Sequence, residues 1–442
     1  MRSDSPELKK NHPPTIRAWV MYDWANSVFQ LTIASAIFPV YFASVTMREG
    51  SDKISFFGRE IINTVLYSWT IAAAYLLVAV LSPGLGAFAD YSGRRKAFMK
   101  AFTWTGACGC GLLFFFGDIP LEAGMSAFFT AWLGYGGSLV FYNSFLPVIA
   151  DSRYHDQISA RGYAMGYLGG VVLLIINLCI ILFPAFFFIR DPALPYQLSF
   201  LTVFLWWTGF SQITFRHLPK YTFGNPHQRH IILQGYRELL KVWRQLRQSR
   251  SMLLYLFAFF FLSSGTLTVM FMAATYGEKE LRLDAAVLIG TILCIQLLGV
   301  AGAFLFAKLS ARFGNINILM AGSLLWVLVC TWAYHIRGPA GFMAVAACVG
   351  LVMGGTQALA RSGWAKMLPE TKDHTSFFSF YDVMEKLSTV AGLFSFGIME
   401  TLTGSMRKSV LSVVAFFSAA FFILLILQAG TTGRQKTVAQ PQ

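Results

Sequence analysis

The chain has 442 residues, of which 56% are hydrophobic and only 13% are charged, and its formal net charge is +14. Apolar runs of about 20 residues, the length that a membrane-spanning helix requires, recur from one end to the other. This pattern excludes a soluble enzyme and predicts an integral membrane protein.

Twelve apolar segments are long enough to cross a bilayer. Leu, Phe, Gly and Ala fill them, which favours helices over the weakly alternating strands of a membrane β-barrel. The expected fold class is therefore an all-α membrane protein with twelve transmembrane helices. The segments cover residues 18–45, 62–89, 97–117, 123–150, 162–189, 196–215, 251–277, 285–309, 316–336, 340–366, 376–402 and 408–428.

The positive charge follows this predicted topology. With both ends on one side, the loops of that side carry 24 Lys and Arg residues and those of the other side carry nine. The positive-inside rule then places both termini in the cytoplasm. The charge is explained by topology, so no nucleic-acid partner is expected. Short outer loops without an Asn-x-Ser/Thr acceptor favour a bacterial inner membrane.

Two landmarks repeat half a chain length apart. A glycine-rich basic loop around Gly93 has a weaker copy that ends at Gly314, and Pro147 and Pro369 repeat that spacing to within one residue. This repetition predicts two six-helix halves, residues 1–215 and 251–442, with the site at their interface.

The segment 216–250 between the halves is polar and basic. Leu240, Trp243 and Leu246 recur there at helical spacing, while Arg237, Lys241 and Arg244 line another face. We expect a cytoplasmic linker with an amphipathic helix that anionic lipid attracts.

The first predicted segment, residues 18–45, carries a polar face inside its apolar run. Asp23, Asn26, Ser27 and Gln30 follow i, i+3, i+4, i+7 spacing. Charged groups in such runs usually face a cavity because lipid exposure is costly. The alternative for Asp23 is a helix cap or an ion pair at the cytoplasmic end.

A second charged group lies in the predicted segments 340–366 and 376–402. Asp382 and Lys386 are spaced i, i+4, as are Gln357 and Arg361, whereas Glu385 is expected to have no partner within its helix. A gate held by ion pairs and a site for a zwitterion predict the same residues, so both interpretations remain open.

The glycine-rich loop has features of a conformational latch. Its glycines permit a tight turn, Asp90 can cap a helix start, and the basic residues mark the inner side. We assign to this latch Gly86, Asp90, Gly93, Arg94 and Arg95, together with Asp151 at the end of the predicted segment 123–150.

The sequence contains no nucleotide-binding loop of the form Gly-x-x-x-x-Gly-Lys-Ser/Thr, which argues against an ATP-driven pump. Its cysteines and histidines show no metal-ligand spacing, so neither a metal nor another cofactor is expected.

The glycine-rich loop resembles the signature between helices 2 and 3 of the major facilitator superfamily. Other motifs are similar to those of its vacuole-effluxer family. That resemblance implies the major facilitator fold and an amino-acid-like solute, and it adds Asn143 to the candidate site. The motifs are Tyr22–Ser27, Phe38–Phe42, Tyr142–Pro147, Arg161–Tyr167 and Gly354–Ser362.

The chain departs from the family pattern at three places: Ala360 replaces an expected Ser, Glu385 an expected Gly, and Leu393 an expected Pro. An extra acid at position 385 could change the substrate or add a protonation site.

We therefore expect a monomeric secondary transporter that moves a small polar or zwitterionic solute by alternating access, with protons as the candidate coupling ion. The alternatives are a lipid or lysolipid transporter of the same fold, and a membrane sensor without transport.

Overall fold

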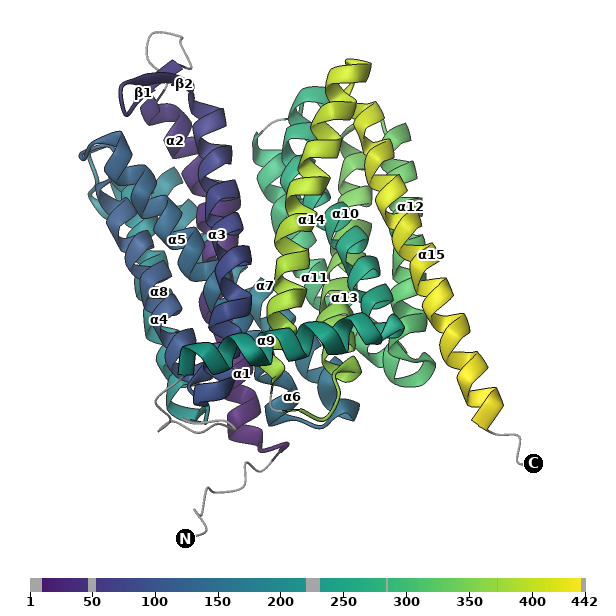
Figure 1. Ribbon diagram of the computed structural model, residues 1–442. Coiled ribbons are helices and arrows are strands. Elements are labelled where there is room, and N and C mark those ends of the chain that lie inside the picture. Colours follow the sequence, from purple (N-terminus) through teal and green to yellow (C-terminus); the bar gives the residue numbers. More distant parts are fainter. Residues whose placement is uncertain (1–9, 47–52, 220–230, 284, 372, 439–442) are drawn as a thin grey trace. The chain divides into compact units, whose positions relative to one another are not determined.

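The computed structural model describes residues 10–46, 53–219, 231–283, 285–371 and 373–438. Each of the twelve predicted segments corresponds to a long helix, in places extended by a short 3₁₀ or π segment (Figure 1). Within the described residues, ten of these are long and apolar enough to cross a membrane by composition. The other two are α5 (Leu121–Ser144), whose apolar run is interrupted by four glycines, and α14 (His374–Thr403), which contains Asp382, Glu385, Lys386 and Glu400.

The helices form two compact units. The first unit comprises Met1–Ile158, Gly169–Glu238 and Leu368–Ser379, and the second comprises Ser159–Leu168, Leu239–Met367 and Phe380–Gln442. Three helices are divided between them. The start of α14 belongs to the first unit, part of α7 (His155–Leu182) belongs to the second, and α9 (Ile231–Gln248) passes from the first to the second after Glu238. The predicted half boundaries at residues 215 and 251 remain a prediction.

Helices that pack against one another build the first unit, in which α4 lies along α5 and α8 lies along α1. Close approach needs glycine here, since a Cβ on Gly134 would overlap the backbone of Gly106. Its elements, besides α5 and α7, are α1 (Pro13–Val28), η1 (Phe29–Ile37), α2 (Phe38–Thr46), α3 (Asn63–Ser92), α4 (Arg95–Leu112), η2 (Leu113–Phe115), α6 (Leu146–Ile149), η3 (Ser152–Tyr154), η4 (Pro184–Phe187) and α8 (Leu194–His217).

A short hairpin precedes α3 and was not predicted. Strands β1 (Lys53–Phe56) and β2 (Arg59–Ile62) pair antiparallel, with Phe56 opposite Arg59. Phe57 and Gly58 both have positive φ, 47° and 75°, as a two-residue turn that matches strand twist requires. The backbone N–H of Phe57 donates to Glu122 Oε1 over 3.0 Å, which ties the turn to the start of α5.

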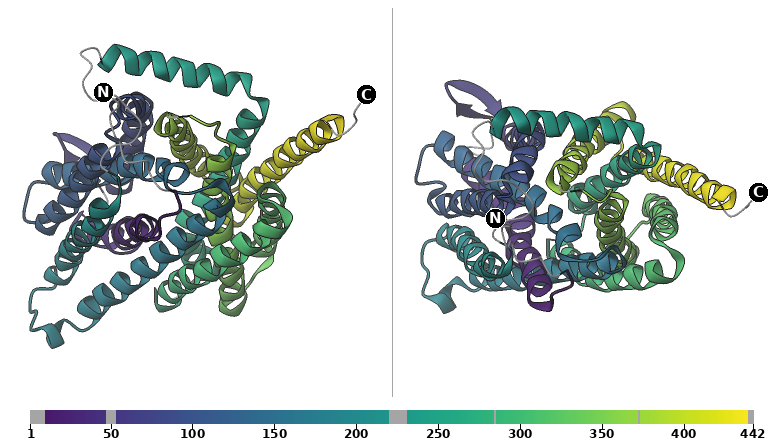
Figure 2. Two further views of the ribbon diagram at one scale, coloured as in Figure 1. Left: turned by 90° about the horizontal axis from the view of Figure 1, so that it is seen from below. Right: turned by 60° about the horizontal axis from the view of Figure 1, so that its bottom comes forward.

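In the second unit α11 packs most extensively against α13, while α15 contacts both α10 and α12. Figure 2 shows the end of α15 projecting away from the other helices of this unit. The elements, besides most of α14, are α9 (Ile231–Gln248, of which Leu239–Gln248 belong here), α10 (Arg250–Leu281), α11 (Ala285–Phe313), α12 (Asn315–His335), α13 (Pro339–Met367) and α15 (Met406–Val438).

Candidate functional site

Asp23 is buried in the first unit and held by an aromatic side chain of α5. Tyr142 Oη donates to Asp23 Oδ2 over 2.8 Å, and Trp19 Nε1 donates to the carbonyl oxygen of Tyr142 over 2.9 Å. The rings of Trp19 and Tyr142 stack with centroids 4.5 Å apart. The carboxylate is therefore fixed against α5 and is only 6% exposed as a residue.

Asn26 and Gln30 continue this polar face toward α5. Asn26 is 1% exposed, and its Nδ2 has no hydrogen-bond partner among the described residues. Tyr135 Oη donates to Gln30 Oε1 over 2.8 Å, and Asn143 lies half-buried on α5 beside Tyr142. No sequence pattern indicated that α1 continues into the π-helix η1 at Phe29, which places Gln30 on a wider helical turn. Such π segments are frequent at functional sites.

Asp90 joins three elements of the first unit. Its Oδ1 lies 2.7 Å from Arg95 Nε, and both side chains are almost fully buried. The carboxylate also accepts the N–H groups of Thr375 and Ser376, over 3.2 and 2.8 Å, and the Ser376 hydroxyl over 3.0 Å. Asp90 therefore binds two of the N–H groups that have no partner within the first turn of α14, where a negative charge is favourable.

Each of the two glycines of the predicted latch is needed at its position for a different structural reason. A Cβ on Gly86 would overlap Ser379 Oγ and crowd the carbonyl of Thr375, so glycine allows α3 to approach the start of α14. Gly93 ends α3 with φ of 67°, a left-handed conformation that favours glycine.

Arg94 and Asp151 make other contacts than Arg95 and Asp90. Arg94 stands exposed before α4 begins, whereas its neighbour Arg95 is 0% exposed. Asp151 Oδ2 accepts a hydrogen bond from Asn11 Nδ2 and lies 3.9 Å from the exposed Arg153. The structure thus gathers Gly86, Asp90 and Arg95 around the start of α14.

His374 is the first residue of α14 and precedes the predicted membrane segment 376–402. Burial is the main cause that lowers the pKa of His374 to about 3, and the charges of Arg95, Lys10 and His155 lower it further. The imidazole is therefore neutral at physiological pH, in a place where an added proton would face other cations.

In the second unit, α14 carries a charge trio of the buried Asp382 and Lys386 and the partly exposed Glu385. Lys386 Nζ lies 2.8 Å from Asp382 Oδ1, as the i, i+4 spacing predicts. The expectation that Glu385 has no partner within its helix is wrong, because Lys386 Nζ also lies 3.1 Å from Glu385 Oε2. Adjacent side chains diverge on a helix, but the long lysine stem reaches both acids.

Glu385 extends from this trio into a small polar cavity of about 20 Å³. Tyr163, Ser263, Gln357 and Tyr381 also line it, and the Glu385 side chain is 32% exposed. A volume of this size holds about one water molecule, so the cavity is nearly closed in this structure.

Arg361 is held by α7 rather than by an acid. Its Nε donates to Ser159 Oγ and its Nη2 donates to the Ser159 carbonyl, both over 2.9 Å, and the guanidinium lies 4.2 Å from the centroid of the Tyr163 ring. Ser159 Oγ in turn donates to the carbonyl of Ala358 over 2.8 Å. One turn earlier, Gln357 Oε1 accepts from Tyr167 Oη over 2.6 Å. Sequence reasoning missed Ser159, because a serine at the start of a helix gives no signal of such a role.

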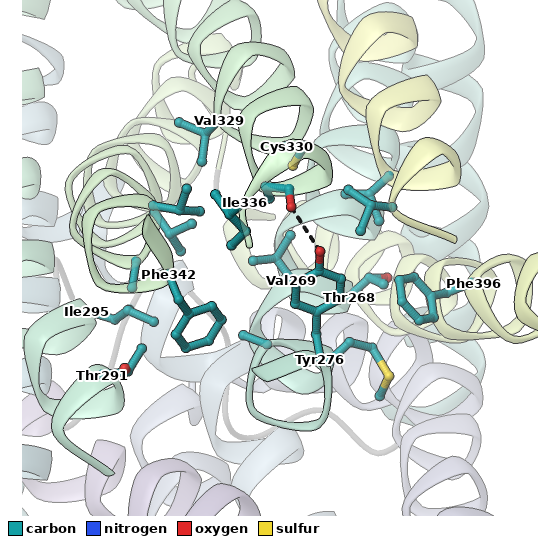
Figure 3. A pocket seen from close by; sticks show the side chains of 18 residues that line it. Thr268, Val269, Tyr276, Thr291, Ile295, Val329, Cys330, Ile336, Phe342 and Phe396 are labelled. Atoms are coloured by element: carbon teal, nitrogen blue, oxygen red, sulfur yellow. Dashed lines mark hydrogen bonds between the residues drawn. The ribbon is translucent and has the colours of Figure 1, made fainter. Parts of the chain in front are cut away.

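A larger cavity of about 70 Å³ also lies in the second unit (Figure 3). Its lining is apolar, with Val269, Ile295, Val329 and Phe342 among the side chains that point toward it. The one ring hydroxyl there, of Tyr276, donates to the carbonyl of Ala333 over 2.9 Å and is therefore satisfied. Thr268 and Thr291 also line the cavity, and their hydroxyls donate to backbone carbonyls of their own helices.

The match to known proteins covers nearly the whole chain. Residues 11–437 match the family described as vacuole effluxer Atg22 like. The chain belongs to this family. An uncharacterised MFS-type transporter of Bacillus subtilis, YxiO, is 29% identical over 94% of this chain and 95% of its own length. Autophagy-related protein 22-1 of Phaeosphaeria nodorum is 24% identical over 94% and 90% of the two chains.

Solved structures agree on the fold. The human organic anion transporter MFSD10 gives a TM-score of 0.72 at 12% identity, covering 94% of this chain and 100% of its own. The Escherichia coli fucose:proton symporter FucP gives 0.69 at 14% identity, covering 94% and 97%. This family member is thus a multi-pass membrane transporter of the major facilitator fold and not an enzyme.

Proposed function

We propose that this transporter moves a small zwitterionic, amino-acid-like solute by alternating access, coupled to protons. The observation that carries the proposal is the charge trio of α14, in which one ammonium group serves two carboxylates beside a polar cavity. The Atg22-like family is consistent with an amino-acid-like solute. The same proposal places the protein as a monomer in a bacterial inner membrane, with both termini in the cytoplasm.

The net charge of the trio favours the binding of a cation beside it. When all three groups are ionised, one negative charge is left over, and Asp382 Oδ2 has no hydrogen-bond partner among the described residues. An uncompensated charge within an apolar helix costs several kcal/mol. A proton or the ammonium group of a solute would remove this excess, and Glu385 is the acid that reaches the cavity.

The contacts of Arg361 support a role in a gate instead of solute binding. Its guanidinium is already engaged by Ser159 and Tyr163, and the residue is only 2% exposed. Ala160 of α7 also packs with Ala303, Ala307 and Ala358. We therefore assign Arg361 and Gln357 to the contact between α7 and α13, which must open if α7 moves, and Lys386 and Glu385 to the solute.

Asp23 is the second acid that we assign to coupling. Its neighbour Asn26 provides an amide nitrogen without a partner among the described residues, and Gln30 lies one turn further. We assign Asn26, Gln30 and Asn143 to the polar groups that contact the solute from the first unit.

Solute-dependent thermal stabilisation of the purified protein tests the proposal. A bound ligand raises the unfolding free energy by about 2.7 kcal/mol at a hundred times its Kd. We expect a shift with one or more amino acids in the parent and loss of that shift in Glu385→Gln. Glu280→Gln is the matched control, because Glu280 is an equally sized acid that pairs with Arg407 at 3.8 Å, away from the cavity. Equal shifts in both variants would contradict the assignment.

A lipid or lysolipid transporter is the second candidate, and the apolar cavity of Figure 3 is the observation that favours it. Its 70 Å³ is about half of the 150 Å³ or so that admits benzene in an engineered protein cavity. An acyl chain would therefore require the helices to separate. A shift with lysolipid, but with no amino acid, would select this candidate.

A further inference from the structure

Helix α9 differs in composition from the helices of the second unit that are long and apolar enough to span a membrane, and its residues Leu239–Gln248 differ from them in direction. It ends at Gln248, and α10 begins at Arg250. Ser249 between them is extended and caps α10 by accepting the N–H of Met252 on its hydroxyl. Leu239–Gln248 consequently run across the direction of α10 (Figure 1). Between residues 231 and 250 the sequence has five cations and a single acid, Glu238.

The side chains of α9 divide into a buried stripe and an exposed face. Val242 and Leu246 are 0% exposed and attach the helix to the second unit. Leu240 and Trp243 are apolar yet 52% and 42% exposed. Around these two lie exposed cations. We call this set the basic face of α9: Leu240, Trp243, Arg237, Lys241, Arg244 and Arg247.

The chemistry of this face fits a phospholipid surface. Trp and Leu beside Lys and Arg match the boundary where acyl chains meet phosphate groups. Because one residue joins α9 to a helix long and apolar enough to span the membrane, the face is tethered at the level of the bilayer surface. We infer that the basic face of α9 binds anionic phospholipid headgroups on the side of the membrane that carries the basic loops.

Lipid bound here would act on α14. The ring of Trp243 stacks on Phe380 with centroids 5.6 Å apart, and the next residue, Tyr381, lines the polar cavity with Glu385. Holding Trp243 at the surface therefore holds α14 where it lines that cavity. The binding surface itself is separate from the solute site and does not depend on the proposed substrate.

Competition between lipids in neutral detergent tests the inference. The purified protein is titrated with phosphatidylglycerol against phosphatidylcholine, and retained lipid is counted by native mass spectrometry. Each cation near the surface contributes about 1 kcal/mol, or about a factor of five in affinity. In the fourfold variant, four cations are replaced together: Arg237→Gln, Lys241→Gln, Arg244→Gln and Arg247→Gln. Its preference for phosphatidylglycerol over phosphatidylcholine is expected to fall by a factor of up to several hundred.

The matched control keeps the charge. Arg237→Lys, Arg244→Lys and Arg247→Lys should retain the preference, since Lys and Arg attract a headgroup by the same charge. If the fourfold variant is less stable in phosphatidylcholine alone, Arg244→Gln by itself should still lose about fivefold. Unchanged preference in both Gln variants would overturn the inference, as would parent protein that binds inorganic phosphate or polyglutamate in place of the lipid.

A second readout tests the link to α14. Phosphatidylglycerol should slow hydrogen exchange of residues 380–386 in the parent and leave it unchanged in the fourfold variant. Equal slowing in both would show that lipid acts elsewhere.

Discussion

Replacement of Asp90 by Asn isolates the charge that binds the start of α14. Asn has the same shape, so the change removes the negative charge with little change in packing. The ion pair with Arg95 connects α3 and α4, whereas the three bonds to Thr375 and Ser376 exist only while the start of α14 is docked. Loss of the ion pair affects the docked and the undocked arrangement alike, so the change in docking comes from the three bonds to Thr375 and Ser376.

The magnitude follows from these three bonds. A hydrogen bond to a charged acceptor contributes about 1.5–3 kcal/mol and a neutral one about 0.5–1.5 kcal/mol. Asn keeps only one acceptor oxygen, so Asp90→Asn weakens the bonds on that oxygen by about 1 kcal/mol each and removes those on the other. Docking is therefore weakened by at least about 3 kcal/mol, or roughly a hundredfold in population. Ser376→Ala removes one hydroxyl bond to this charged acceptor, for which about tenfold or more is expected.

The assay is the labelling rate of a cysteine at position 379. Ser379 is 0% exposed and its hydroxyl donates to the carbonyl of Ser82 over 2.9 Å, so a thiol there reacts only when the start of α14 leaves α3. The exposed Cys108 and Cys179 are first replaced by Ala. Asp90→Asn should accelerate labelling roughly a hundredfold, with a normal size-exclusion profile. An unchanged rate in folded protein would refute the reasoning.

Three other changes test neighbouring features. Gly86→Ala puts a methyl group against Ser379 and Thr375, so it should weaken docking by about 1–3 kcal/mol and accelerate the same labelling; a slower rate would contradict the close contact. His374 has a folded-state pKa of about 3, below the unfolded value, so its contribution to docking is present above about pH 6.5 and is lost as the pH falls toward 3. Acidification slows the thiol chemistry of both proteins alike, so the rate of the parent relative to that of His374→Gln should rise as the pH falls. A ratio that does not change with pH would exclude a contribution of this histidine to docking. Tyr142→Phe leaves the buried Asp23 without its hydroxyl donor and should lower the unfolding free energy by about 1–3 kcal/mol, seen as a lower midpoint in thermal size-exclusion assays, whereas an unchanged midpoint would show that the bond contributes little.

The helices could be predicted from the sequence because their cause is local. Uninterrupted apolar runs must satisfy their backbone within the bilayer, and helices do so whatever their neighbours are. The hairpin at residues 53–62 depends instead on a turn in which Phe57 adopts positive φ, an uncommon conformation for a bulky residue. The π segment from Phe29 to Ile37 likewise has no pattern that separates it from the α-helix around it.

The sequence indicated which residues belong to the candidate site, but it did not indicate which distant residues they contact. The spacing of Asp382 and Lys386 gave their ion pair, since i, i+4 neighbours face each other on a helix. Arg361 instead binds Ser159, and Asp90 binds backbone groups of Thr375 and Ser376, each far away in the chain. These partners follow from packing between distant helices, which a single sequence does not encode in any local pattern.

Uptake of amino acids into proteoliposomes tests the central proposal most directly. With an imposed pH gradient, the parent should accumulate at least one amino acid above its equilibrium level, and a protonophore should abolish this accumulation. Asp23→Asn should lose the gradient-driven accumulation but keep exchange, and Glu385→Gln should lose both while Glu280→Gln keeps both. Parent vesicles that move lysolipid but no amino acid would contradict the proposed substrate, and accumulation by Asp23→Asn equal to that of the parent would contradict its assignment to coupling.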